Sequence, residues 1–183
     1  MTEDQIRSLI KQVKEGDQDA FGKLYDEYFD RIFAYLAWRT DRREVAEDLA
    51  SSVFLKALEA LPKYRPGKAP FSAWLFRIAH NLLLNHYRTS GLSVSVDFGA
   101  DYPEIVSEDD PSRDFQRKAD RARIHAAIKH LTEEQQSVIV MKFIGGLSNK
   151  EIGTAIGKRE GSIKSLQHRA LAALGRHLGG SDE

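Results

Sequence analysis

Apolar residues recur every three or four positions along most of this chain, which is the spacing of one buried face of an α-helix. Residues 3–14 follow this spacing first, and Gly16 interrupts it. Asp17 can cap a long second helix, and Asp41, which has capping-box spacing with Glu44, opens a third. No stretch shows sustained alternation of apolar and polar residues, so the pattern predicts helices and no sheet.

The third and fourth predicted helices complete a four-helix unit. A loop over 62–70, broken by Pro and Gly, leads into a helix from about 71 to 88. The third helix is expected to turn six apolar residues inward: Val45, Leu49, Val53, Phe54, Ala57 and Leu58. In the fourth helix, one arc of the helical wheel is expected to face the core: Leu75, Ile78, Ala79 and Leu82.

Helical patterning resumes at about residue 113. Thr132 and Ser148 each stand three residues before a Gln or Glu, which is capping-box spacing, and so begin two further helices. The second of these is short, Gly157 ends it, and a last helix runs from about 160 to 178. A short helix, a glycine turn and a longer helix make a helix-turn-helix candidate, although any small helical hairpin shows part of this pattern.

The stretch between the two helical units, residues 89–112, contains glycines and prolines with weak periodicity, and we interpret it as a linker. It carries 6 acidic and no basic side chains, whereas 113–183 carries 13 basic and 8 acidic ones, so the formal net charge of zero conceals an uneven distribution. A disordered acidic spacer without contacts remains an alternative for it. The fold prediction is all-α, with one domain over 1–88 and a helix-turn-helix domain over 113–183, joined by an acidic flexible linker.

Residues 60–96 contain no Asp or Glu, although charged residues make up 30% of the chain. Lysines, arginines and aromatic residues alternate there, a composition that suits single-stranded nucleic acid because cations neutralise phosphates and rings stack on unpaired bases. Arg77, Asn81 and Arg88 lie opposite the core arc of the wheel and continue the basic loop. The candidates for strand binding are Lys63, Tyr64, Arg65, Lys68, Phe71, Trp74, Arg77 and Asn81. The alternative, which stays open, is that three of the aromatic residues belong to the core: Phe71, Trp74 and Phe76.

The last predicted helix has the layout of a recognition helix. Its inward side is expected to hold Ile163, Leu166 and Ala170. The opposite arc, which would meet the major groove of duplex DNA, then carries polar residues that can donate to base edges, with a cation at its flank suited to a phosphate. The candidates for duplex binding are Lys164, Ser165, His168 and, at the flank, Arg169.

The sequence carries little that suggests catalysis or a metal. It has no cysteine, and its six histidines are scattered, without metal-ligand spacing or a nucleophile constellation. We therefore expect no catalytic residue, no metal site, no cofactor and no enzymatic activity. No apolar run approaches the ~20 residues of a membrane span, and the first residues lack a signal-peptide pattern, so we expect a cytoplasmic protein with no membrane partner.

The motifs resemble those of bacterial sigma factors, specifically the compact extracytoplasmic-function (group IV) sigma factors of the sigma-70 family. Three segments look like the family's region 2: Asp19-Ala20-Phe21…Leu24-Tyr25, Ala46-Glu47-Asp48-Leu49…Val53-Phe54-Leu55-Lys56-Ala57 and Phe71…Trp74-Leu75…Arg77-Ile78-Ala79-His80-Asn81. Three more look like its region 4: Leu131-Thr-Glu-Glu-Gln-Gln…Val138, Gly146-Leu147-Ser148…Glu151-Ile152 and Ile163-Lys164-Ser165…His168-Arg169-Ala170. The match covers about residues 17–88 and 120–175.

The resemblance implies a sigma factor that binds core RNA polymerase and directs promoter-specific transcription initiation. The third helix, with Asp48, Leu49 and Phe54, would dock on the clamp helices of the β′ subunit, although Leu49 and Phe54 could equally be core residues. The β flap is a further implied contact on polymerase. The loop and helix at 63–81 would capture the opened non-template strand of the −10 element, and the last helix would read the −35 element. An anti-sigma factor is a further implied partner, and the polymerase-bound protein would be associated with the nucleoid.

The last helix departs from the family pattern at one point, because Leu166-Gln167 stands where Arg-Leu is usual, which removes one expected phosphate contact. The alternative function is a polymerase-independent helix-turn-helix regulator of transcription that binds duplex DNA. Such a regulator has no reason to carry the acid-free aromatic and basic stretch. A promoter spacer of roughly 17 base-pair steps spans about 58 Å, so the linker must be stretched to bridge it. We therefore expect the free protein to be more compact than the promoter-bound one.

Overall fold

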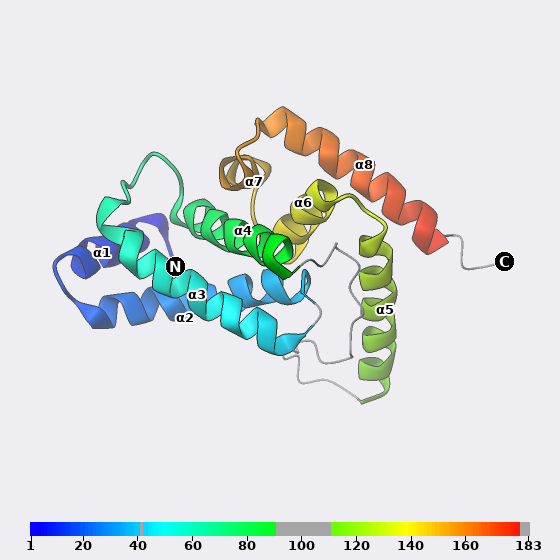
Figure 1. The fold of residues 1–183 in the computed structure, drawn as a ribbon, viewed down its shortest axis with the longest axis horizontal. Helices are drawn as coiled ribbons and strands as arrows, with labels where there is room; N and C mark the ends of the chain where they lie inside the picture. Colours follow the sequence, from blue (N-terminus) through cyan, green and yellow to red (C-terminus); the bar gives the residue numbers. More distant parts are fainter. Residues whose placement is uncertain (41, 91–110, 180–183) are drawn as a thin grey trace.

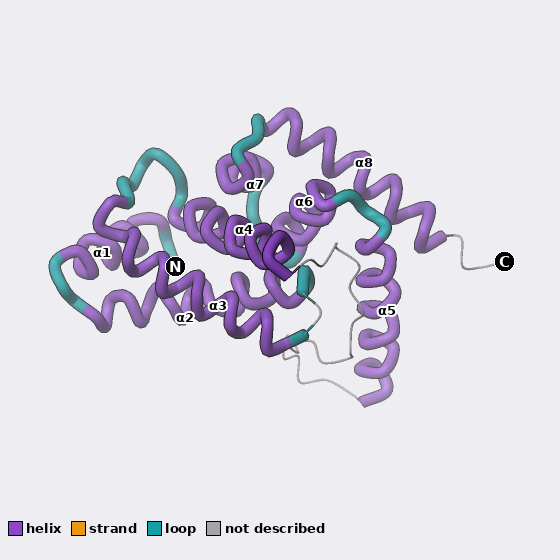
Figure 2. Tube along the Cα trace, viewed as in Figure 1, coloured by secondary structure: helices purple, strands orange, loops and turns teal. Residues whose placement is uncertain are grey.

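The computed structural model describes residues 1–40, 42–90 and 111–179, without the side chains of residues 111–119. In this part of the chain every regular element is a helix, which confirms the all-α prediction (Figures 1 and 2). The first unit consists of α1 (Glu3–Lys14), α2 (Gln18–Ala37), α3 (Arg43–Ala60), the 3-10 turn η1 (Leu61–Lys63) and α4 (Phe71–Ser90). The second consists of α5 (Pro111–Lys129), α6 (Glu133–Phe143), α7 (Asn149–Ile156) and α8 (Glu160–Gly179).

The helices begin where local capping chemistry predicts, with one exception. The Asp17 carboxylate accepts from the backbone N–H groups at the start of α2, at 2.9 and 3.2 Å. Thr132 and Ser148 each head a complete capping box, on α6 and α7. The expected cap of α3 is not observed: its N-cap is Arg42, which makes no side-chain capping bond, and Asp41 lies outside the described residues.

The helix-turn-helix prediction matches the geometry of α7 and α8. Gly157 ends α7 in the left-handed region at φ 73°, a conformation that favours glycine. At Gly153, an added Cβ would stand 2.6 Å from the backbone oxygen of Lys158, so only glycine allows this close approach. Ile163, Leu166 and Ala170 of α8 are buried as expected, so the opposite face of α8 is open to solvent.

The core of the first unit differs from the pattern in detail. Leu75 and Ala79 are fully buried, but Ile78 and Leu82 are only half-buried, and Phe76 and Leu83 take fully buried places instead. On α3, Val53, Phe54 and Ala57 are buried, whereas Val45 and Leu49 are half-buried. Leu58 was expected to face inward and is 43% exposed. The core therefore lies about one position away from the predicted arc on both helices.

The two units pack against each other, because α4 lies beside α7 (Figure 1). The acidic linker prediction for 89–112 falls almost wholly on residues 91–110, which lie outside the described residues. At its edges, α4 continues to Ser90 and α5 begins at Pro111. The division into a domain over 1–88 and a domain over 113–183 stays a prediction.

Candidate nucleic-acid interfaces

The loop before α4 is anchored by an aromatic cluster of Tyr28, Tyr64, Phe71 and Trp74. The Tyr64 ring lies 5.7 Å from the Phe71 ring and 4.9 Å from the Trp74 ring, measured between centroids. The Tyr64 hydroxyl donates to the backbone oxygen of Ala69 at 2.8 Å and so closes the loop. Burial raises the pKa of the Tyr64 phenol.

This cluster corrects part of the strand-binding prediction. Tyr64 is 7% and Phe71 3% exposed, so neither offers a free ring face in this conformation, and Phe76 is fully buried. For Phe71 and Phe76 the core alternative holds. Trp74 is half-buried at the edge of the cluster, so it keeps accessible ring surface.

The charged candidates of the same stretch lie on the surface. Lys63, Arg65, Lys68 and Arg77 are all exposed, as is Asn81. Within residues 1–40, 42–90 and 111–179, no carboxylate forms a salt bridge with any of these four cations. Exposed positive charges without a carboxylate partner produce a potential that attracts a polyanion.

A cavity of about 600 Å³, the α3–α4 groove, opens between the end of α3, η1 and α4. Its lining residues are Lys56, Glu59, Ala60, Lys63, Ile78, Asn81, Leu82 and Asn85. Ile78 and Leu82 give it an apolar wall on which a base can lie, and the amides of Asn81 and Asn85 can both donate to and accept from a base edge. Lys56 and Lys63 add positive charge for a phosphate. The groove therefore suits an unpaired nucleotide.

Sequence reasoning found only Lys63 and Asn81 among the groove residues. Asn81 and Asn85 lie one turn apart on α4, and Lys56 and Glu59 lie one turn apart on α3, so each pair shares a helix face. On each helix, that spacing could have indicated from the sequence that the two polar residues share a face. Which faces meet, however, depends on how α3 and α4 pack.

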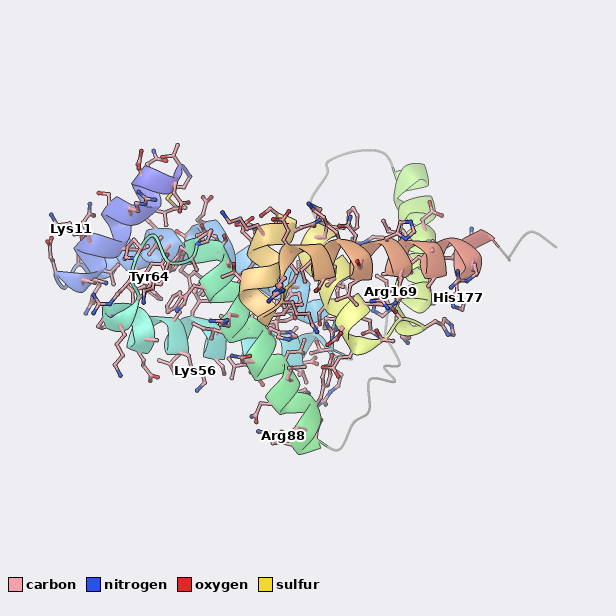
Figure 3. All side chains as sticks on the ribbon, turned by 90° about the horizontal axis from the view of Figure 1, so that it is seen from above. Lys11, Lys56, Tyr64, Arg88, Arg169 and His177 are labelled. Atoms are coloured by element: carbon pink, nitrogen blue, oxygen red, sulfur yellow. The ribbon has the colours of Figure 1, made fainter. Side chains whose placement is uncertain are left out.

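The recognition candidates of α8 are all exposed. Lys164 forms an ion pair with Glu160 one turn earlier, at 3.0 Å between Nζ and Oε1. The Ser165 hydroxyl donates to the backbone oxygen of Gly161 at 3.1 Å, and Arg169 Nε lies 3.4 Å from the backbone oxygen of Ser165. His168 lies on the same open face. Lys56 and Tyr64 lie toward one end of the molecule in Figure 3, and Arg169 and His177 toward the other.

The docking candidates on α3 divide between surface and core. Asp48 is exposed and Leu49 is half-buried. Phe54 is 5% exposed and packs on the Tyr25 ring at 4.6 Å between centroids, so the core alternative holds for it. Leu55, which the sequence analysis did not select, is 60% exposed and lies two turns from Asp48 on the same face. Asp48 and Leu55 are therefore both accessible on one face of α3.

The described ranges, 1–40, 42–90 and 111–179, offer neither a metal site nor a membrane span. They contain no group of three or more His, Asp or Glu side chains that could hold a metal ion. None of their helices is long and apolar enough to cross a membrane.

Two family models match the chain: Sigma-70 region 2 over residues 24–92 and Sigma-70, region 4 over residues 121–174. The ECF RNA polymerase sigma factor BldN of Streptomyces coelicolor is 34% identical over 94% of this chain and 66% of its own length, slightly under two thirds. The ECF RNA polymerase sigma factor SigW of Bacillus subtilis is 32% identical over 94% of this chain and 96% of its own length. Among solved structures, CnrH in complex with the cytosolic domain of CnrY has the same fold, with a TM-score of 0.77 and 24% identity over 97% of this chain and 99% of that one.

Proposed function

This chain belongs to the extracytoplasmic-function (ECF) family of RNA polymerase sigma factors, and we propose that it captures the separated −10 strand in the α3–α4 groove and reads the −35 duplex with α8. A polymerase-independent regulator is not favoured, because the matches cover both halves of a sigma factor in order. A protein that acts with polymerase on promoter DNA is expected in the cytoplasm, at the nucleoid.

One observation carries the assignment of the −10 site: the α3–α4 groove is lined by two lysines, Lys56 and Lys63, and two amides, Asn81 and Asn85, against one carboxylate, Glu59. Arg77, exposed one turn before Asn81 on α4, adds a further cation. The cations would hold the strand by its phosphates, while the amides of Asn81 and Asn85 would read the edge of a flipped base. Trp74 would stack on a neighbouring base with its accessible surface. Tyr64 and Phe71 would support the loop from the core.

The energy balance assigns strand separation to polymerase. Opening about ten base-pair steps costs roughly 14 kcal/mol at ~1.4 kcal/mol per step. Two or three captured bases return about 1–3 kcal/mol each. The groove would therefore trap a strand that polymerase has helped to separate. The isolated protein should leave promoter bases unreactive to permanganate, and appreciable opening without polymerase would contradict this division.

The duplex-reading role rests on the exposed arc of α8. Lys164, Ser165 and His168 would face base edges, and Arg169 would contact a phosphate. Lys164 forms an ion pair with Glu160 in the free protein. This ion pair must therefore break when Lys164 contacts DNA.

Two protein partners follow from the family. The face of α3 that carries Asp48 and Leu55, with Leu49 at its edge, would dock on the β′ clamp helices, and the second unit would contact the β flap. The family implies an anti-sigma factor as a further partner, and CnrH, which has the same fold, was solved in complex with the cytosolic domain of CnrY.

Run-off transcription tests the proposal directly. Sigma-free polymerase with this chain, on a library of promoter fragments, is expected to give specific transcripts, whereas neither component alone does so. Asn81→Ala should reduce open-complex formation, and Thr89→Ala, exposed near the end of the same helix, serves as the control. A fully active Asn81→Ala protein would remove the groove from the mechanism.

A further inference from the structure

Arg31 of α2 connects the first unit to the second. Its Nε and Nη2 both donate to the backbone oxygen of Gly145, at 2.9 and 2.7 Å. Its guanidinium also lies over the Tyr28 and Phe76 rings, 5.5 and 5.8 Å from their centroids. A cation with two hydrogen bonds to one carbonyl and two ring contacts is held in a single geometry.

A second connection joins α4 to α7. The Ser72 hydroxyl donates to Glu151 Oε1 at 2.5 Å, while Glu151 Oε2 accepts from the Ser148 backbone N–H at 2.8 Å in the capping box. Burial acts to raise the pKa of Glu151, but the hydrogen bonds from Ser72 and Ser148 outweigh it and the pKa is lowered. At Gly145 an added Cβ would stand 2.7 Å from the Phe76 ring, so α4 and the turn before α7 fit closely.

Arg39 destabilises the packing of the first unit against the second. It is 1% exposed, and Nη1 donates to Ser137 Oγ of α6 at 2.7 Å. Its Nε and Nη2 are buried with no hydrogen-bond partner in the part of the chain that the structure describes. The ring of Tyr87, 5.9 Å from the guanidinium carbon, compensates only in part. A buried cation without a carboxylate is costly, and separation of the units would return it to water.

We propose that Arg31, Ser72, Gly145 and Glu151 form a latch, the α4–α7 latch, which keeps the free protein closed, and that Arg39 weakens it enough for polymerase and promoter to open it. The proposal rests on the proposed function, because α4 bears the strand-binding residues and α7–α8 the duplex-binding ones. Because the promoter elements lie about 58 Å apart, we expect α4 and α7 to separate when both elements are engaged. The latch therefore limits promoter binding by the free chain.

Distances between spin labels in the free, full-length chain test the latch. Because the chain has no cysteine, Lys23→Cys on α2 and Arg176→Cys on α8 introduce the only two labelling sites. With the latch unaltered, the two spin labels should lie mainly at one short distance from each other. Arg31→Ala should lower the closed-to-open ratio roughly ten-fold or more, the usual effect of losing a charged hydrogen bond. Arg39→Met should raise the ratio by a similar factor, since an apolar residue replaces an uncompensated buried charge.

Arg43→Ala is the matched control, because this arginine pairs with Glu47 within α3 and should leave the distances unchanged. If helix content shows that Arg31→Ala fails to fold, Ser72→Ala makes the same test. Identical distances in all variants, or opening by Arg39→Met, would overturn the latch. The measurement uses neither polymerase nor DNA, so its failure is distinct from a failure of the proposed function, which would appear as missing run-off transcripts.

Discussion

The two surfaces that we propose to face DNA are built in different ways. On α8, all four recognition candidates are exposed along one helix, and the inward residues are those that the pattern predicted. On the first unit, Tyr64 and Phe71 are buried, and the proposed binding surface is a groove shared by α3, η1 and α4. Duplex DNA already displays its base edges in the major groove, so one exposed helix suffices. A separated strand must be held by its phosphates and bases together, which requires several elements.

Acid should weaken the frameworks beneath both surfaces, and this is the largest effect that we expect. Burial lowers the pKa of His80, beside Arg39 and Tyr35, and of His125, beside Lys129 and Trp38, to about 4 each. Both histidines are therefore neutral in the folded protein, and the stability they confer is complete above their unfolded pKa of about 6.5 and lost as the pH falls towards 4. At pH 5 each should cost about 2 kcal/mol of unfolding free energy.

Urea unfolding at pH 7.5 and pH 5 measures this loss. His125→Gln should remove about half of the pH dependence, and His168→Gln, an exposed histidine on α8, should leave it unchanged. An unfolding free energy that is the same at both pH values would show that neither histidine is neutral because of burial.

Removal of the Trp74 ring should affect the strand surface alone. Trp74→Ala should make the free energy of open-complex formation less favourable by about 1–3 kcal/mol, the usual contribution of one stacked base. Permanganate reactivity of polymerase–promoter complexes measures it, and duplex binding should be spared. Phe143→Ala, which removes a 57% exposed ring elsewhere, is the control. An equal loss in both variants would mean that Trp74 acts through general stability.

Removal of the Lys164 charge should affect duplex reading and spare strand opening. Lys164→Ala should weaken discrimination at one −35 base pair by about 1 kcal/mol, because an amine contact to a base edge is lost. Fluorescence anisotropy with −35 duplexes that differ at single positions measures this, and strand opening on a pre-melted promoter should not change. Lys150→Ala, an exposed lysine on α7, provides the comparison. Uniform weakening across all duplexes would reassign Lys164 to a phosphate contact.

The smallest effect should come from the carboxylate that pairs with Lys164. Glu160→Gln removes an exposed ion pair worth about 0.3–0.5 kcal/mol, so duplex affinity should rise about two-fold. The same anisotropy titration at low salt measures it, and the gain should fade as salt increases. A loss of affinity would show that Glu160 positions Lys164 for DNA.

The sequence by itself determined the helices, three of the four predicted caps and the exposed arc of α8. Capping by Asp17, Thr132 and Ser148, and the left-handed glycine at 157, depend on neighbours within a few residues. The division of α8 into an inward and an outward face also depends on nearby sequence, because its inward residues pack against an adjoining helix of the same small unit.

Tertiary structure alone decided the α3–α4 groove, the burial of Tyr64, Phe71 and Phe54, and the latch between the units. Each depends on where a distant segment lies: Arg31 meets Gly145, 114 positions later, and Arg39 meets Ser137, 98 positions later. A periodic pattern shows that a helix has an apolar face, but an aromatic residue near its edge can serve the core or a ligand equally well. Only the packing of the neighbouring helices determines whether such a ring is covered.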